Sequence, residues 1–315
     1  MDGQAVSATA AVVGADATPL PRNVLSVVLG ETLFKTWYSS FYPEELVGKA
    51  VDRLYVCQWC FKYAVDVEEY ARHQMLCERR GHPLGRTIYQ KEPFEIYEVD
   101  GAKNKTFAQN LSLFAKLFLD TKSVFFDVFG FKYYLLMQNQ PGQDGQVVGF
   151  FSKEKMSWDN NNLACILVFP PWQRKGLGQI LMGTSYELSE REGRIGGPEK
   201  PLSELGRKSY LRFWQGRICQ AVLGMRNKSS VEVHELAKMC SMTTDDVILT
   251  LKSIGLCEVR KKDDGLGISK SRIRDWIAKN KIDPKLAVDP DGFIPLDDSS
   301  AAEEEEEEED VSGSE

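Results

Sequence analysis

Four residues near the N-terminus have the types and the spacing of a zinc site. Cys57 and Cys60 are separated by two residues, His73 follows after twelve more, and Cys77 after a further three. A tight turn presents the two thiolates from one side, and a helical stretch over residues 68–77 places His73 and Cys77 one turn apart on the other. Since protein ligands then fill all four positions of a tetrahedral ion, the pattern predicts a structural zinc. The alternative is a group of buried free cysteines with a core histidine.

The second candidate site is the run Gln173, Arg174, Lys175, Gly176, Leu177, Gly178 and Gln179. It lies between a predicted buried strand and a helix with apolar residues on one face. Glycines there let backbone amides converge on an anion at the positive end of the helix, which suits a pyrophosphate. The run is neither a P-loop nor a three-glycine dinucleotide fingerprint. A plain connecting turn is the alternative, but the two basic residues favour phosphate.

The elements that must position these sites alternate between strands and helices. Helical spacing predicts one helix at 110–119 and another after the glycine loop, and composition predicts a turn at 139–145. The strand-like segments are 23–42, 94–99, 124–127, 133–137, 147–152 and 163–169. This alternation predicts an α/β core with the glycine loop at a strand-to-helix junction.

Residues 231–259 have a different pattern, that of a helix-turn-helix followed by a wing. Two short amphipathic helices are predicted, and Thr243 with Thr244 caps the second. A helix that reads DNA should be basic, whereas residues 245–254 contain two aspartates and a single lysine. We therefore expect no direct sequence-specific DNA binding, although the basic run 260–262 could contact phosphates.

The formal charge of −7 is concentrated at one end of the chain. Of the 46 acidic residues, 13 lie in 289–315, where there is no Lys or Arg, so the rest of the chain is mildly basic. Seven consecutive glutamates at 303–309 repel one another too strongly to pack, which predicts a disordered acidic tail over 283–315. The tail is either a solubilising end or a docking surface for a basic partner.

The overall composition is that of an ordinary globular protein, with 315 residues of which 43% are hydrophobic and 27% charged. No run approaches the roughly 18 consecutive apolar residues of a membrane-spanning helix, so we expect no membrane partner. Seven cysteines without a secretion signal predict a reducing, intracellular compartment. The Ala-rich residues 1–22 are predicted to be a disordered head.

Residues 54–214 resemble the catalytic domain of the MYST family of lysine acetyltransferases. The matching runs are LYVCQWCFKY, IYEVDGAKNKTFAQNLSLFAKLFLDTKSVFFDV, VVGFFSKEK, NLACILVFPPWQRKGLG, SYELSEREG and GGPEKPLSELG. The resemblance extends weakly to Asn23 and to about Val259. It implies an α/β acetyl-CoA N-acyltransferase (GNAT-like) core with an N-terminal zinc finger and a C-terminal helix-turn-helix or winged-helix-like subdomain.

The resemblance also implies a division of the chain. The expected parts are a head (1–22), an N-terminal region (23–92) with the zinc finger at 54–80, a catalytic core (93–215), a helix-turn-helix subdomain (216–282) and the tail (283–315). Acetyl-CoA would be held at its pyrophosphate by Gln173 to Gln179. The resemblance assigns further coenzyme contacts to Ser203 and, through backbone hydrogen bonds, to the strand residues Ile166, Leu167 and Val168.

Three more residues acquire roles from the resemblance. Glu199 matches the general base, Cys165 the cysteine beside the acetyl group, and Lys122 the lysine that is acetylated within the enzyme. A lysine amine has a pKa of about 10.4, so a base must remove a proton before it attacks a thioester. A partly apolar cleft would raise the pKa of Glu199 and make it a better base.

Each of these residues also has a plainer interpretation. Glu199 could be a solvated loop residue, and Lys122 a surface lysine before a strand. Cys165 either accepts the acetyl group or only shapes the pocket while the amine attacks acetyl-CoA directly. We favour direct attack, because nothing nearby in the sequence would generate a thiolate.

Some positions depart from the family pattern. Gln179 replaces a common lysine, Arg212 a small hydroxyl residue and Trp172 a tyrosine. The neutral Gln179 would weaken phosphate binding modestly, and Arg212 could supply the missing charge. Since no catalytic group is lost, we do not expect an inactive enzyme.

These features together predict a histone acetyltransferase with a tail of histone four, within the nucleosome, as its preferred substrate. The compact chain resembles the short fungal silencing-type branch of the family, the catalytic subunit of the SAS complex, so accessory subunits are expected. Nuclear localisation follows from the expected substrate. The alternatives are a non-catalytic chromatin-binding zinc-finger module and an acetyltransferase for non-histone proteins.

Overall fold

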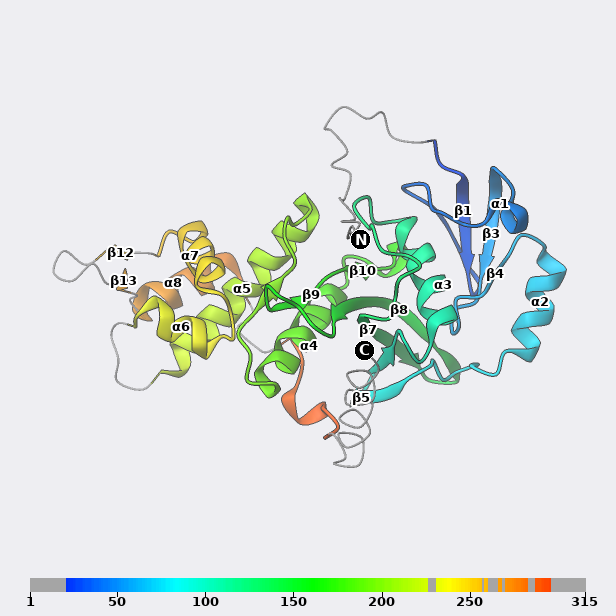
Figure 1. The fold of residues 1–315 in the computed structure, drawn as a ribbon. Helices are drawn as coiled ribbons and strands as arrows, with labels where there is room; N and C mark the ends of the chain where they lie inside the picture. The colour runs from blue at the N-terminus through cyan, green and yellow to red at the C-terminus, as the bar shows by residue number, and fades with distance from the viewer. Residues whose placement is uncertain are drawn as a thin grey trace, which may run out of the picture.

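The computed structural model describes residues 21–225, 231–256, 258–259, 266–267, 270–282 and 287–295. Within them, an N-terminal sheet lies at one end, a helical subdomain at the other, and a five-stranded sheet with its helices between (Figure 1). The predicted head up to residue 20, the basic run 260–262, and residues 283–286 and 296–315 of the predicted tail lie outside the described residues. The prediction of a disordered tail from residue 283 is wrong for residues 287–295, because Val288 and Phe293 are buried in a core of the protein.

The N-terminal sheet has the strand order β2-β1-β3-β4. Its elements are β1 (Val24–Leu29), β2 (Thr32–Lys35), β3 (Val51–Val56) and β4 (Tyr63–Ala64), with the short helix α1 (Glu44–Val47) between β2 and β3. Helix α2 (Val67–Leu76) follows β4, and the Asp66 carboxylate caps it by accepting hydrogen bonds from the amides of Glu68 and Glu69. This confirms the predicted helix that contains His73.

The central sheet is entirely antiparallel, with the order β10-β8-β7-β6-β5. Its strands are β5 (Arg86–Lys91), β6 (Phe94–Asp100), β7 (Phe131–Gln140), β8 (Gln143–Glu154) and β10 (Ile166–Val168). Strand side chains alternate between two cores. Tyr133 and Leu135 pack with α3 (Lys105–Lys116) and the N-terminal sheet, whereas Tyr134 and Leu136 pack with α4 (Leu177–Arg191).

The predicted strand at 163–169 is wrong as a single element, because the chain divides it between two sheets. β9 (Asn161–Leu163) pairs in parallel with β11 (Gly197–Pro198), and only β10 joins the central sheet. Between them, the Ala164 amide donates to the Ser152 carbonyl and the Ser152 amide to the Cys165 carbonyl, both at 2.8 Å. Two residues thus oppose one, which is a β-bulge that redirects the strand.

Other predicted boundaries also need correction. The stretch 124–127 is not a strand, since its backbone pairs with no neighbouring strand among the described residues and Phe126 is exposed. The helix predicted at 110–119 begins earlier and ends sooner, as α3. The strands predicted at 94–99 and 133–137 are confirmed as parts of β6 and β7, and the turn at 139–145 lies at the β7-β8 hairpin.

The helical subdomain confirms the predicted helix-turn-helix. It consists of α5 (Glu204–Gly224), α6 (Val233–Met239), α7 (Thr244–Ser253) and α8 (Lys270–Asn280), with β12 (Glu258–Val259) and β13 (Leu266–Gly267) as the wing. The Thr243 hydroxyl caps α7 by accepting from the Asp246 amide at 3.2 Å. Its core includes Met182 and Tyr186 of α4, so the subdomain packs directly on the helix that follows the glycine loop.

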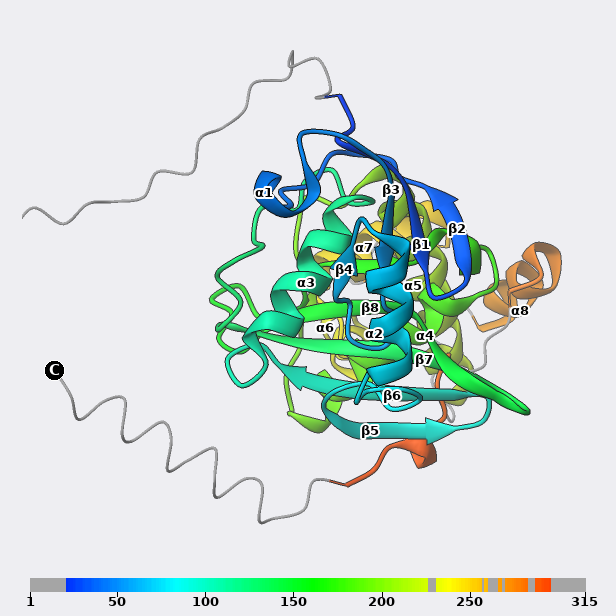
Figure 2. The same ribbon diagram turned by 90° about the vertical axis from the view of Figure 1, so that its right-hand side faces the viewer.

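Residues 287–295 return from the helical subdomain to the central sheet, beside β5 (Figure 2). The segment contains a short 3-10 turn, η2 (Pro290–Gly292). Phe293 is buried against Tyr89 with ring centroids 4.9 Å apart, and the guanidinium of Arg191 lies 4.8 Å from the Phe293 ring. Val288 is buried in the same core. This segment therefore completes the face of the sheet that α4 covers.

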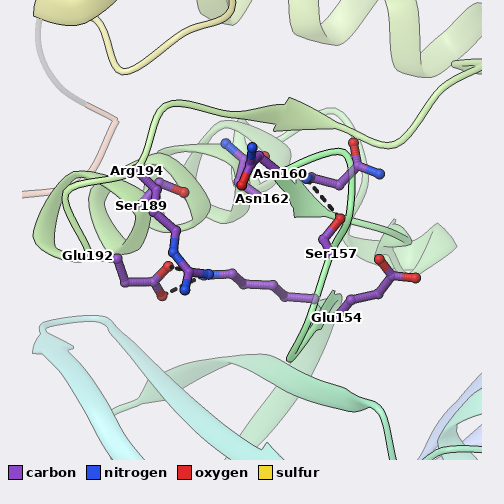
Figure 3. A pocket seen from close by; sticks show the side chains of 9 residues that line it. Glu154, Ser157, Asn160, Asn162, Ser189, Glu192 and Arg194 are labelled. Carbon is purple, nitrogen blue, oxygen red and sulfur yellow. Dashed lines mark hydrogen bonds and ion pairs between the residues drawn. The ribbon is translucent and has the colours of Figure 1, made fainter.

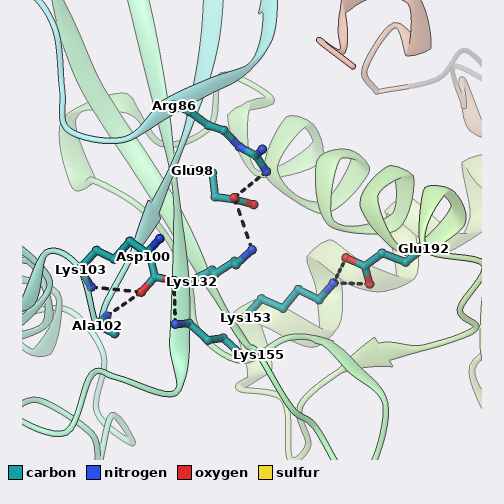
Figure 4. A network of polar contacts seen from close by, with 9 residues as sticks. All are labelled: Arg86, Glu98, Asp100, Ala102, Lys103, Lys132, Lys153, Lys155 and Glu192. Atoms are coloured by element: carbon teal, nitrogen blue, oxygen red, sulfur yellow. Dashed lines mark hydrogen bonds and ion pairs between the residues drawn. The ribbon is translucent and has the colours of Figure 1, made fainter. Parts of the chain in front are cut away.

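Ion pairs connect neighbouring strands of the sheet at one edge of this face (Figure 4). Glu98 accepts from Arg86 at 2.8 Å and lies 3.6 Å from Lys132. Lys153, which is buried, reaches Glu192 just beyond α4, with a distance of 2.6 Å to Oε2. Among the described residues, we find no helix with the length and apolar character needed to cross a bilayer.

The close approach of β10 to β8 depends on Gly149. A Cβ at this position would lie 2.7 Å from the Leu167 carbonyl oxygen and 3.0 Å from the Val168 Cα. We expect Gly149→Ala to lower the free energy of unfolding by about 1–3 kcal/mol, the usual cost of overpacking. Denaturant unfolding measures it. Gly130→Ala is the matched control, since a Cβ there meets no atom within 4 Å. Equal stability of the two variants would contradict the explanation.

Candidate active site and metal centre

The four predicted zinc ligands come together at the end of the N-terminal sheet. One potential ligand atom from each of Cys57, Cys60, His73 and Cys77 lies within 4.8 Å of all the others. The sulfurs of Cys57 and Cys77 are 3.7 Å apart, and the Cys60 sulfur is 3.2 Å from His73 Nε2. A tetrahedral zinc with Zn–S bonds of about 2.3 Å separates two sulfurs by about 3.8 Å, so the spacing fits zinc. His82, nearby in sequence, is exposed.

The zinc cluster is joined to the central core through the residue that follows Cys60. Phe61 is fully buried and has a positive φ of 58°, a conformation uncommon for a non-glycine residue. Its ring lies 5.5 Å from that of Phe114 in α3 and 6.0 Å from that of Phe169, just after β10. The turn that presents two thiolates therefore also places a core side chain beside the segment that leads to the glycine loop.

Glu199 is placed by the pairing of β11 with β9. Glu199 directly follows β11, and its amide donates to the carbonyl of Leu163, the last residue of β9 before the bulge, at 2.8 Å. Partial burial raises the pKa of the Glu199 carboxyl, the negative charge of Glu154 raises it further, and Lys122 opposes the rise. The side chain is still largely exposed, so a modest rise is expected. The direction agrees with that expected of a general base.

Lys122 is not a surface lysine. Only 7% of its surface is exposed, and its charge acts on Glu199 although it lies in the irregular segment between α3 and β7. The fold therefore places Lys122 near enough to Glu199 for its positive charge to lower the pKa of that carboxyl.

Cys165 occupies the bulge itself and is half-buried. Its amide donates to the Ser152 hydroxyl at 3.2 Å. Among the described residues, none makes a hydrogen bond to its thiol. Tyr133 lies near enough for the charge of Cys165 to act on it, but burial raises the pKa of Tyr133 to about 12, so its hydroxyl stays protonated near neutral pH and cannot take up the thiol proton. Among the described residues, the thiol therefore has no hydrogen-bonded base.

The glycine loop has the geometry of an anion site at the beginning of α4. It follows a 3-10 turn, η1 (Pro170–Trp172), and both Arg174 and Gly176 have positive φ, 61° and 83°. Gly176 is the N-cap and has no side chain to bind the first amides of the helix. Arg174 and Lys175 are exposed on the same loop. The amides and the two cations are available to a phosphate group.

β10 is the edge strand of the central sheet, so one side of its backbone has no partner strand. The Phe169 amide donates to the Val148 carbonyl, and the register pairs Leu167 with Phe150. Because ladder bonds alternate, Leu167 directs its backbone groups toward β8, and those of Ile166 and Val168 face outward. The Val168 carbonyl already accepts from Gln173 Nε2 at 2.8 Å. We therefore expect Ile166 and Val168, rather than Leu167, to offer backbone hydrogen bonds.

Ser203 and Gln179, two residues expected to contact the coenzyme, both make side-chain hydrogen bonds within the protein. Ser203 is exposed at the N-cap of α5, and its hydroxyl accepts from the Gly206 amide at 3.1 Å. Gln179, in the first turn of α4, donates from Nε2 to the Ser209 carbonyl at 3.4 Å. Gln179 therefore helps to join α4 to α5, a role that does not require a positive charge.

A shallow polar recess, open to solvent, lies beside β9 (Figure 3). It is lined by Lys153, Glu154, Ser157, Asn160, Asn161, Asn162, Ser189, Glu192 and Arg194. Sequence reasoning missed Glu154 as a residue that influences the base. It is distant from Glu199 in the sequence, and its only signal was its place within the run VVGFFSKEK.

The mixed α/β fold and the cluster of Cys57, Cys60, His73 and Cys77 match the expectation of an acetyl-CoA N-acyltransferase core preceded by a zinc finger. The description "MOZ/SAS family" applies to a family model that matches residues 82–293, and a model of the MYST family zinc finger domain matches residues 21–77. The chain belongs to the MOZ/SAS family of MYST proteins.

Several curated relatives are similar to this chain. Histone acetyltransferase MOF of Drosophila melanogaster is 43% identical over 257 residues, which cover 81% of this chain and 31% of that protein. Histone acetyltransferase mst1 of Schizosaccharomyces pombe is 41% identical over 240 residues, 76% of this chain and 50% of that protein. The Histone acetyltransferase Tip60 homolog of Caenorhabditis elegans is 37% identical, with coverages of 85% and 60%. The chain thus spans between about a third and three fifths of these relatives.

Loss of a zinc ligand should release the metal and destabilise the protein. We expect Cys60→Ser to reduce bound zinc from one ion per chain to nearly none, because metal binding supplies folding free energy to such clusters. Because the metal-bound turn would no longer hold Phe61 in the central core, the thermal midpoint of unfolding should fall by about 10 °C. Elemental analysis and calorimetry measure the two effects. His82→Asn, the control, should keep its zinc, and a Cys60→Ser protein with full zinc and an unchanged midpoint would refute the assignment.

Proposed function

We propose that this protein is an acetyl-CoA-dependent protein lysine acetyltransferase that acts on histone tails. The observation that supports it most is the convergence of three features at the bulge around Cys165. After the bulge, β10 has an unpaired backbone edge, and the glycine loop that follows it offers amides and cations. Before the bulge, β9 pairs with β11, and Glu199 directly follows β11. The relatives MOF and mst1 are named histone acetyltransferases, which agrees with this assignment.

In this mechanism, the residues from Gln173 to Gln179 hold the pyrophosphate, and Ile166, Val168 and Ser203 offer further coenzyme contacts. Glu199 accepts a proton from the substrate ammonium group, and the free amine attacks the thioester carbonyl. A C–N bond forms, the C–S bond breaks, and coenzyme A leaves as a thiolate that takes up a proton. The zinc held by Cys57, Cys60, His73 and Cys77 takes no part in the chemistry, because no ligand position is open.

We propose direct transfer rather than an acetylated cysteine. The support comes from the surroundings of Cys165, whose thiol has no hydrogen-bonded base among the described residues. Its place in the bulge is consistent with a side chain that shapes the acetyl pocket.

Lys122 is proposed to be acetylated within the enzyme, with a consequence for the base. Its positive charge lowers the pKa of Glu199, and acetylation removes that charge. Modified protein would therefore have a Glu199 that is protonated at higher pH than in unmodified protein.

The finer assignments are proposals of the same kind. We propose a tail of histone four as the preferred substrate, membership of the short SAS-type branch, association with accessory subunits and residence in the nucleus. The negative charge of Glu154, which acts on Glu199, suits a basic peptide. An acetyltransferase for non-histone proteins would use the same geometry.

The decisive test is transfer of labelled acetyl from acetyl-CoA to core histones. We expect Glu199→Gln to lower kcat by about 10²–10⁴-fold, the usual contribution of a general base, with coenzyme affinity retained. Cys165→Ala should keep most of the activity if transfer is direct. Glu45→Gln, in the distant α1, is the control and should match the native chain. If native protein binds coenzyme and histones but transfers nothing, the binding-module alternative replaces this proposal.

The pH dependence gives a second test, because Glu154 and Lys122 shift the pKa of Glu199 in opposite directions. The base must be deprotonated, so kcat/KM falls as the pH falls through the pKa of Glu199, which lies above the usual carboxyl range. Glu154→Gln removes the like charge and should move this acid limb to lower pH. Lys122→Met removes the opposing charge and should move it to higher pH. Shifts of the same sign would show that another group controls the limb.

A further inference from the structure

The N-terminal end of α7, in the helix-turn-helix, is packed against the loop that contains Glu199. The Gly196 amide donates to the Ser241 carbonyl at 3.4 Å. Gly197 has no room for a side chain, because a Cβ would lie 2.6 Å from Asp246 Oδ2. The second helix of this motif therefore meets the candidate active site rather than an open surface.

Asp246 is a buried carboxylate whose charge is balanced from the catalytic loop. Only 1% of its side chain is exposed, and its Oδ1 accepts from Lys200 Nζ at 2.7 Å. Its Oδ2 has no hydrogen-bond partner among the described residues. A buried charge without a counterion is costly, so the position of Lys200 is strongly favoured even though half of its side chain is exposed.

Lys200 directly follows Glu199, so this ion pair fixes the loop on the side opposite to β9. On one side the Glu199 amide is bonded to Leu163, and on the other the Lys200 ammonium is bonded to Asp246. The loop is thus held between the sheet and the helix-turn-helix, with the Glu199 side chain between the two attachments.

We propose that Asp246 is a positioning residue for Glu199 that acts through Lys200, and that the helix-turn-helix serves as a support for the catalytic loop. The proposal rests on the function proposed above for Glu199. It also accounts for the acidic first turn of α7, since Asp246 faces a cation within the same chain. A small displacement of a reacting group has a large effect on rate, and a shift of about 1 Å can cost about a hundredfold.

The test compares Lys200→Met, which keeps the length of the side chain without its charge, with Lys200→Arg, which keeps the charge. We expect Lys200→Met to lower kcat about tenfold while the KM and the calorimetric Kd for acetyl-CoA stay unchanged. Lys200→Arg should stay within about twofold of native kcat, because the exposed half of Lys200 leaves room for a guanidinium. Lys208→Met is the matched control, since it breaks an exposed ion pair with Glu204 in the adjacent helix α5.

A double variant separates positioning from general stability. Lys200→Met and Asp246→Asn should each lower kcat. The double variant should be no worse than the poorer single variant, because each substitution removes the same Lys200–Asp246 ion pair. Additive losses would overturn the proposal, as would native kcat in Lys200→Met. A Lys200→Arg protein as poor as Lys200→Met would also overturn it.

Hydrogen exchange provides a readout that does not depend on activity. In Lys200→Met, the amides of Gly196, Gly197, Glu199 and Lys200 should exchange faster, whereas those of α5 should match the native chain. Unchanged exchange in this loop would overturn the positioning role even if the protein proved not to be an acetyltransferase. If instead native protein transferred no acetyl group while the loop loosened as expected in Lys200→Met, the proposed function would fail and the link between Asp246 and the loop would stand.

Discussion

The β-bulge opposite Ser152 determines where the candidate reacting groups of this protein lie. Because Ala164 and Cys165 together oppose one residue of β8, the chain before them is free to pair with β11, and the chain after them resumes the sheet as its edge. Glu199 and the unpaired backbone of β10 consequently meet at the same point. Without the extra residue, a continuous strand would leave β11 without its partner and the candidate base without its position.

Features specified by local spacing could be predicted from the sequence. The four zinc ligands follow from a tight turn and one helical turn, and the cap at Thr243 follows from its hydroxyl and the acids after it. The bulge could not be predicted, because seven consecutive apolar residues from Leu163 look the same whether the strand is straight or redirected. The false strand at 124–127 has a related cause, since aromatic residues there indicated a sheet although Phe126 is exposed.

For Glu199, the chemistry of the expected reaction predicts the direction of its pKa shift, whereas the fold determines which residues lie around it. The need to deprotonate an amine led to the expectation of a raised pKa, and burial does raise it. The charged residues that act on Glu199 or pair with its neighbour Lys200, however, are Glu154, Lys122 and Asp246, which come from β8, an irregular segment and a helix of another subdomain. Sequence patterns of period two or 3.6 contain no information about such contacts.

The return of residues 287–295 to the central sheet also constrains how the protein is made. β5 and α4 are synthesised long before Val288 and Phe293, which complete the core between them. During translation, the part of this apolar face that Val288 and Phe293 cover stays exposed after α4 has been made, until these residues have left the ribosome. Exposed apolar surface on an incomplete sheet favours aggregation, so the order of synthesis makes the nascent chain more prone to aggregate than the finished protein.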